Sequence, residues 1–221
     1  MKRHLLFSVR GNLLAQGEPK DIFKDCLISA KHFIDTNSVT DILNYAFKRD
    51  ENKKSVTESV GNFVHVGFIS PYRDLTMDDM KRVSNTVGFV SSCSGANSAV
   101  VARELGQLEA RDNILTAIFT ASIGKTPGKS AYVEVFIPDE KEIPVNKWIE
   151  NEVGTHIGLI LSELSSFGKV RDAFLAEGFQ VASFMRGNRI DNPDKRVSVI
   201  YYEKWHGEER LRLEVLSPWE S

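Results

Sequence analysis

The chain has 221 residues, of which 42% are hydrophobic and 26% charged, and its formal net charge is −2 at pH 7. This balance is typical of a soluble globular protein with a sizeable buried core. It excludes the strongly basic surface of nucleic-acid-binding domains, and no apolar run approaches the roughly 18 residues that a membrane span needs. Two cysteines, Cys26 and Cys93, give no disulfide framework, so we expect free thiols and a cytoplasmic location.

The first part of the chain predicts helices. Pro19 suits the first turn of a long helix, because apolar residues recur at helical spacing after it. Ser38 and Asp41 form a predicted capping box for a second helix. The polar stretch 48–59 predicts a solvated linker. Residues 1–60 are therefore expected to form an N-terminal helical extension that ends in a linker.

Beyond this extension the pattern changes to short strands separated by single helices. Strands are predicted at 63–69, 89–92, 115–121, 131–137, 155–161, 179–184, 197–203 and 210–216, and helices at 76–87 and 165–177. Gly88 and Gly178 follow the two helices and predict their ends. Thr76 and Asp79 are the predicted capping pair of the first helix. The stretch 96–109 is ambiguous and fits an inserted helix or loop.

An internal duplication organises these elements. The matching segments are His65-Val-Gly-Phe-Ile with His156-Ile-Gly-Leu-Ile, Gly88-Phe with Gly178-Phe, Gly95 with Gly187, and Glu134-Val-Phe-Ile with Glu214-Val-Leu-Ser. The residue numbers of the first three pairs differ by 90 to 92 and those of the glutamates by 80, so the first copy carries roughly eleven extra residues. The duplication predicts two modules, at 61–142 and 143–221, each with a strand, a helix and three further strands.

The duplication places one histidine and one glutamate in each module. Because side chains alternate along a strand, His65 and His156 each share a face with a glycine two residues further on, which leaves room beside the ring for an ion or substrate. Glu134 and Glu214 lie on the fourth strands, whose opposite faces are apolar. We therefore expect all four side chains to point into the concavity of a curved sheet.

These four residues predict a single divalent-metal site. A carboxylate on a mostly apolar strand face is costly unless it is paired or binds a cation. Two imidazoles and two carboxylates suit Zn, Ni, Co, Fe or Mn, and they leave up to two positions for water or substrate oxygens. Taken singly, a strand histidine is more often a core or surface residue and a glutamate before a turn is more often solvated; the matched positions favour the metal site.

The pattern resembles the vicinal oxygen chelate superfamily, which includes glyoxalase I, methylmalonyl-CoA epimerase and extradiol dioxygenases. The phrase Gly154-Thr-His-Ile-Gly-Leu-Ile, soon after Val133-Glu-Val, is similar to the join between modules in glyoxalase I-type proteins. The resemblance covers residues 63–221 and implies an α+β fold, with two βαβββ modules forming a curved mixed sheet. The first 60 residues have no counterpart in the minimal members of the superfamily.

The resemblance maps the ligands to His65, Glu134, His156 and Glu214. Members with this full set are mostly isomerases or lyases, in which the metal holds two neighbouring oxygens of a small substrate and stabilises an enediolate. A glutamate, here Glu134 or Glu214, then acts as the base. The alternatives are an Fe(II) dioxygenase that uses His65, His156 and Glu214, and a non-catalytic small-molecule-binding protein, although such proteins usually lose the ligands.

Two further residues are candidate substrate contacts from strand alternation alone: Arg212, on the face of Glu214, and Tyr132, beside Glu134. Arg212 could instead hold Glu214 in place. No glutathione or CoA site is recognisable, and the N-terminal helices could dock a partner. The strand edges and the helical extension favour a homodimer.

Overall fold

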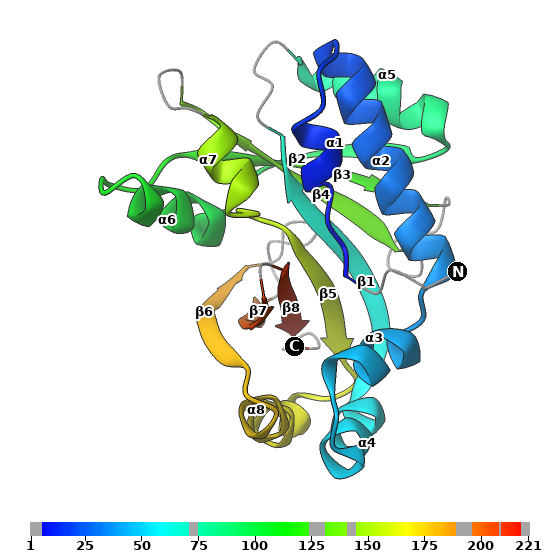
Figure 1. The fold of residues 1–221 in the computed structure, drawn as a ribbon, viewed down its shortest axis with the longest axis vertical. Helices are drawn as coiled ribbons and strands as arrows, with labels where there is room; N and C mark the ends of the chain where they lie inside the picture. Colours follow the sequence, from blue (N-terminus) through cyan, green and yellow to red (C-terminus); the bar gives the residue numbers. More distant parts are fainter. Residues whose placement is uncertain are drawn as a thin grey trace. The chain divides into compact units, whose positions relative to one another are not determined.

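The computed structural model describes residues 6–70, 75–123, 131–140, 145–188, 196–207 and 209–217 (Figure 1). The chain forms two compact units. The first unit draws its described residues from 1–7, 35–65 and 156–221, and the second from 8–34 and 66–155. Within the described ranges, no helix is long and apolar enough to cross a membrane.

The N-terminal helices are divided between the two units. The short helix α1 (Arg10–Leu13) and the long helix α2 (Pro19–Thr36) lie largely in the second unit, and α2 begins at Pro19 as predicted. The apolar stripe of α2 is buried there, and the Phe23 ring lies 6.4 Å from the rings of both Phe68 and Phe119. Burial also raises the pKa of the Cys26 thiol in this stripe to about 12.

The helices α3 (Val39–Ala46) and α4 (Asp50–Ser59) belong to the first unit. The predicted capping box of α3 is present: the Asp41 N–H donates to Ser38 Oγ at 3.1 Å, and the Ser38 N–H donates to the Asp41 carboxylate at 3.0 Å. The phenylalanine that ends α3, Phe47, packs edge-on against Phe174 at 4.9 Å between ring centroids. Through this contact the end of α3 packs against the aromatic core of the unit.

The prediction that residues 48–59 form a solvated linker is wrong, because α4 occupies most of that stretch. No local side chain caps its start. The carboxylate of Glu177 accepts hydrogen bonds from the backbone N–H groups of Lys48 and Arg49 at 3.1 and 3.0 Å, and from the Asn52 amide at 2.9 Å. A cap that comes from residue 177 leaves no signal in the local sequence. The buried residues Val56 and Ser59 mark the inner face of the helix.

The strands and the helices α5 and α8 follow the predicted order, whereas α7 was not predicted. In the second unit these are β1 (Val60–Ile69, shared with the first unit), α5 (Met77–Val87), β2 (Val90–Asn97), α6 (Ala99–Leu108), β3 (Thr116–Ser122), β4 (Tyr132–Pro138) and α7 (Val145–Glu150). In the first unit they are β5 (His156–Leu161), the 3₁₀ turn η1 (Leu164–Ser166), α8 (Phe167–Ala176), β6 (Gln180–Asn188), β7 (Arg196–His206) and β8 (Glu209–Leu216). The ambiguous stretch 96–109 is thus largely the helix α6.

The two sets of strands are ordered in the same way. One set runs β1-β4-β3-β2 and the other β5-β8-β7-β6, so each first strand lies beside its fourth. The β2–β3, β3–β4, β6–β7 and β7–β8 pairs are antiparallel, whereas β5–β8 is parallel. This mixed arrangement, with one helix after each first strand, confirms the predicted α+β class with two βαβββ sets. The duplication itself stays a prediction from the sequence.

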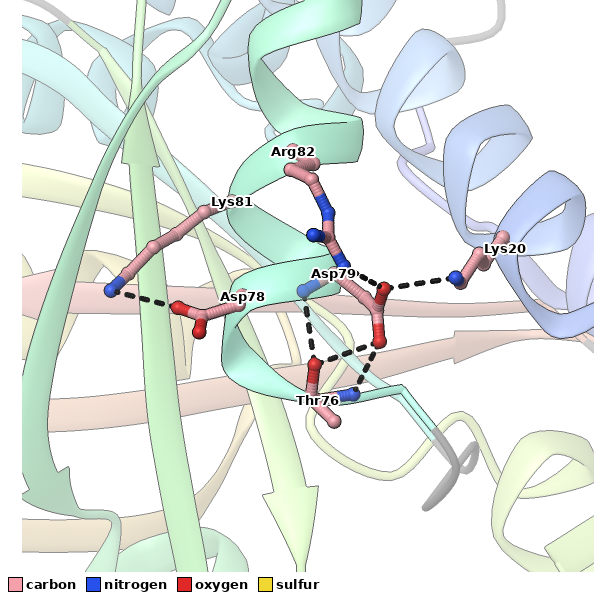
Figure 2. Close-up of polar contacts among 6 residues, drawn as sticks. All are labelled: Lys20, Thr76, Asp78, Asp79, Lys81 and Arg82. Carbon is pink, nitrogen blue, oxygen red and sulfur yellow. Dashed lines mark hydrogen bonds and ion pairs between the residues drawn. The ribbon is translucent and has the colours of Figure 1, made fainter.

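The start of α5 is held by a network around Asp79 (Figure 2). The Asp79 N–H donates to Thr76 Oγ1 at 3.1 Å and the Thr76 N–H donates back to the Asp79 carboxylate at 3.2 Å, which confirms the predicted capping box. The other carboxylate oxygen of Asp79 pairs with Lys20 of α2 at 2.9 Å and with Arg82 at 2.6 Å. These hydrogen bonds, those from Lys20 above all, hold the pKa of Asp79 well below its usual range. Gly88 ends the helix with φ of 90°.

We expect the contribution of Asp79 to folding to depend on pH. Because its folded-state pKa lies below the ordinary value, the network stabilises the fold above about pH 4 and loses this effect as the pH falls below that value. Asp79→Asn should therefore lower the free energy of unfolding in urea more at pH 7 than at pH 3. Asp78→Asn is the control. Asp78 is exposed, and in the described residues its one ion pair is with Lys81 on the same helix, at 3.6 Å. Equal losses for Asp79→Asn at both pH values would contradict the prediction.

Candidate metal centre

Three of the predicted ligands meet inside the first unit. His65 comes from β1, His156 from the start of β5 and Glu214 from β8. The strands β5 and β8 are parallel neighbours, with Gly158 opposite Glu214, and β1 lies on the other side of β5. The three side chains are almost fully buried, with residue exposures of 0% for His65, 2% for His156 and 4% for Glu214.

The ligand atoms of these side chains converge. Nε2 of His65 lies 2.6 Å from Oε2 of Glu214 and 2.9 Å from Nε2 of His156, and the third edge of the triangle, from His156 to Glu214, is 3.3 Å. Ligands at adjacent corners of an octahedron, with bonds of about 2.0–2.2 Å, lie about 2.8–3.1 Å apart. The triangle therefore has nearly the size of one face of a metal coordination shell.

The chemistry of this triangle also suits a cation. Two imidazole nitrogens can face each other at 2.9 Å only when a proton or a metal ion lies between them. Burial by itself raises the pKa of Glu214, but the adjacent imidazoles of His65 and His156 outweigh this effect and hold the pKa well below its usual range. Glu214 is therefore ionised at neutral pH, which is the form that binds metal.

Gly158 has a different role from the one expected. The sequence predicted that the glycine two residues after His156 leaves room for an ion or substrate. A Cβ atom at Gly158 would lie only 2.3 Å from Cε1 of His65, so the ring of the other histidine fills that space. The glycine thus lets the His65 ring approach the backbone of β5, which sets the position of a ligand.

The other predicted site residues on the first copy lie in the second unit. Glu134 is in β4, where it is buried with 7% exposure and lies opposite Thr120 of β3. Tyr132 begins β4 and lies opposite Ser122. The roles of Glu134 as a ligand or base, and of Tyr132 as a substrate contact, stay predictions from the sequence.

Arg212 and a tyrosine not predicted from the sequence extend the site in the first unit. Arg212 lies two residues before Glu214 on β8 and is 4% exposed. Its guanidinium carbon lies 4.7 Å from the centroid of the Tyr201 ring. Tyr201 is opposite Glu214 on β7 and packs edge-on against the His156 ring at 5.4 Å. The turn at Gly207 could have revealed Tyr201, since the loop of a hairpin fixes which residues lie opposite each other.

No protein-family model matches the chain, and no curated protein matches its sequence. Among solved structures, a methylmalonyl-CoA epimerase of Streptomyces coelicolor is similar with 18% identity and a TM-score of 0.41, covering 72% of this chain and 95% of its own. The epimerase of Mycobacterium tuberculosis has 15% identity and a TM-score of 0.40, with 72% and 89% covered. BphC, a halotolerant catechol dioxygenase, has 10% identity and a TM-score of 0.39, with 72% and 40% covered.

We expect Gly158→Ala to displace His65, because the added methyl group overlaps its ring. Overpacking of this kind costs about 1–3 kcal/mol of unfolding free energy. Urea unfolding measures the loss, and NMR of the histidine ring protons reports the displacement. Gly168→Ala is the matched control, since a Cβ atom there, in α8, meets nothing within 4 Å. An unchanged His65 signal in Gly158→Ala would show that the close approach is not needed.

Proposed function

We propose that the chain binds one divalent metal ion through His65, His156 and Glu214, with Glu134 as a fourth ligand. We further propose that it is a metal-dependent isomerase or lyase that acts on a small molecule with two vicinal oxygens. The observation that carries the proposal is the convergence of three buried ligand atoms within 3.3 Å of one another. Such a set is costly to bury in the absence of a cation or a shared proton.

The donor atoms narrow the choice of metal. Two imidazole nitrogens with one or two carboxylate oxygens favour borderline divalent ions, namely Zn, Ni, Co, Fe or Mn, over Ca or Mg, which prefer oxygen ligands alone. Three or four protein ligands leave at least two positions of an octahedral shell for a substrate. Two neighbouring oxygens of a hydroxycarbonyl compound fit such a pair of positions.

Both glutamates are proposed ligands, and we assign the additional role of base to one of them. Oε2 of Glu214 contacts both imidazoles, so Glu214 holds the ion. Glu134 is then the candidate base that removes a proton from the carbon beside the substrate carbonyl. A bound divalent ion would polarise that carbonyl and lower the cost of the proton transfer. Because the site is buried, water is kept from the reacting atoms.

A second candidate function is favoured by one observation. The three residues that meet in the first unit are two histidines and one carboxylate, which is the ligand set of non-haem Fe(II) oxygenases. An Fe(II) dioxygenase would use His65, His156 and Glu214 and would need no fourth ligand. A non-catalytic small-molecule-binding protein is the remaining alternative. A homodimer and a cytoplasmic location stay predictions from the sequence.

We expect the protein, purified without chelators, to contain about one equivalent of a divalent transition metal. His65→Ala, His156→Ala and Glu214→Ala should each reduce its metal affinity by at least about tenfold, because each removes one of a small number of ligands. Metal content is measured by elemental analysis after dialysis against a weak chelator.

His206→Ala is the matched control for these variants. His206 lies at the end of β7 in the same unit, where its ring contacts Tyr45 at 5.8 Å, so its loss should leave the metal in place. A wild-type protein that takes up no transition metal, or equal metal content in wild type and His65→Ala, would refute the metal site.

Proton transfer and oxygen chemistry are separated by a second experiment. The proposed isomerase should exchange deuterium from the solvent into an α-hydroxycarbonyl compound, and Glu134→Gln should reduce this exchange by about a hundredfold or more while changing metal content far less. Proton NMR follows the exchange. Oxygen uptake with a catechol and no exchange with any hydroxycarbonyl would favour the dioxygenase instead.

A further inference from the structure

The two histidines of the metal centre are positioned by different means. The His65 ring lies against the backbone of β5, because Gly158 has no side chain there. The His156 ring instead contacts two other rings. It meets the His65 ring at 5.0 Å with an interplanar angle of 84°, and the Tyr201 ring at 5.4 Å with an angle of 83°. The orientation of His156 is therefore set against two rings that stand almost perpendicular to it.

The Tyr201 ring has a defined position of its own. It lies on β7 directly opposite Glu214 and is buried with 5% exposure. The Arg212 guanidinium lies over the ring, at 4.7 Å from its centroid. On the other side of β7, Ser183 of β6 lies opposite Tyr201, and a β-bulge interrupts the register next to Ser183. Bulges are common beside functional sites, where they redirect a side chain. Both neighbouring strands thus help to fix the ring that contacts His156.

The next residue on β7 carries a ring with a different task. Tyr202 points to the opposite face, since side chains alternate along a strand. Its ring is fully buried and stacks on Phe174 of α8, at 4.3 Å between centroids. In the other set of strands, the residue opposite Glu134 is Thr120, so that position carries no ring. Of the two adjacent tyrosines, Tyr201 is therefore the one that belongs to the metal centre.

We propose that Tyr201 is a positioning residue, which holds the His156 imidazole in the orientation that binds the metal ion. This inference rests on the proposed function and adds to that site a residue that is not a ligand. An imidazole can turn about two side-chain bonds, whereas a ligand must stay within about 10–20° of its productive orientation. Perpendicular contacts between aromatic rings are favoured, because the positive edge of one ring meets the negative face of the other. The ring of Tyr201, rather than its hydroxyl, is the group that acts on His156.

The inference is tested by changing the ring and loading each variant with Co²⁺, whose visible absorption depends on the geometry of its ligands. Tyr201→Phe keeps the ring, so it should retain the wild-type spectrum and bind Co²⁺ within about twofold of the wild type. Tyr201→Met removes the ring, so it should alter the spectrum and weaken Co²⁺ binding about three- to tenfold, the effect of losing one ring contact. Competition with a chelator of known affinity measures the binding.

Tyr202→Met is the matched control. It removes a similarly buried ring from the next residue of β7, on the face that packs against α8. It should lower the free energy of unfolding in urea and leave the Co²⁺ spectrum and affinity unchanged. Tyr201→Leu is the second variant, to be used if Tyr201→Met does not fold.

The outcomes separate the inference from the proposed function. If the wild type binds Co²⁺ and Tyr201→Met has the same spectrum and affinity, the inference is overturned and the metal site stands. The inference also fails if Tyr201→Phe loses as much affinity as Tyr201→Met, or if Tyr202→Met alters the spectrum to the same extent. Failure of both Tyr201→Met and Tyr201→Leu to fold would overturn it too, because the ring would then be a core residue. A wild type that binds no Co²⁺ would refute the proposed function, and the inference would fall with it.

Discussion

The contact between the Glu214 carboxylate and the two imidazoles is the constraint around which the first unit is arranged. A carboxylate with 4% exposure is tolerated only because His65 and His156 approach one of its oxygens at 2.6 and 3.3 Å. These side chains come from three strands, so the contact exists only if β1, β5 and β8 pair in the correct register. The absence of a side chain at Gly158 is part of the same requirement, since the His65 ring occupies that space. Chemistry and strand pairing thus depend on the same few residues.

Local signals in the sequence were sufficient for most of the secondary structure. Capping boxes at Ser38 and Thr76 and the glycine at Gly88 act within a few residues, so they can be recognised without the fold. The repeated spacing of histidine and glutamate also predicted part of the tertiary structure. It identified three side chains that the structure brings together from distant parts of the chain. Spacing alone could not supply their geometry, and it misassigned the space beside Gly158, since the ring of His65 on another strand fills that space.

The parts that sequence reasoning missed depend on contacts between remote residues. The helix α4 begins where the carboxylate of Glu177 accepts hydrogen bonds from two backbone N–H groups. The residues next to Asp50 contain no capping signal from which this contact could be predicted. Tyr201 joins the site through its place opposite Glu214, which is a property of the β7–β8 register.

The cap supplied by Glu177 determines whether the N-terminal segment of the chain can be removed. The predicted modules begin after the first 60 residues, so that the sequence pattern makes the preceding segment look like a removable appendage. Glu177 is buried with 7% exposure, and its carboxylate accepts hydrogen bonds from Lys48, Arg49 and Asn52. A chain without these 60 residues would leave this carboxylate without those donors and remove Phe47, which packs against the ring of Phe174. The helices α3 and α4 are part of the hydrophobic and polar interior of the first unit, so loss of the segment would require replacement of the residues that contact it.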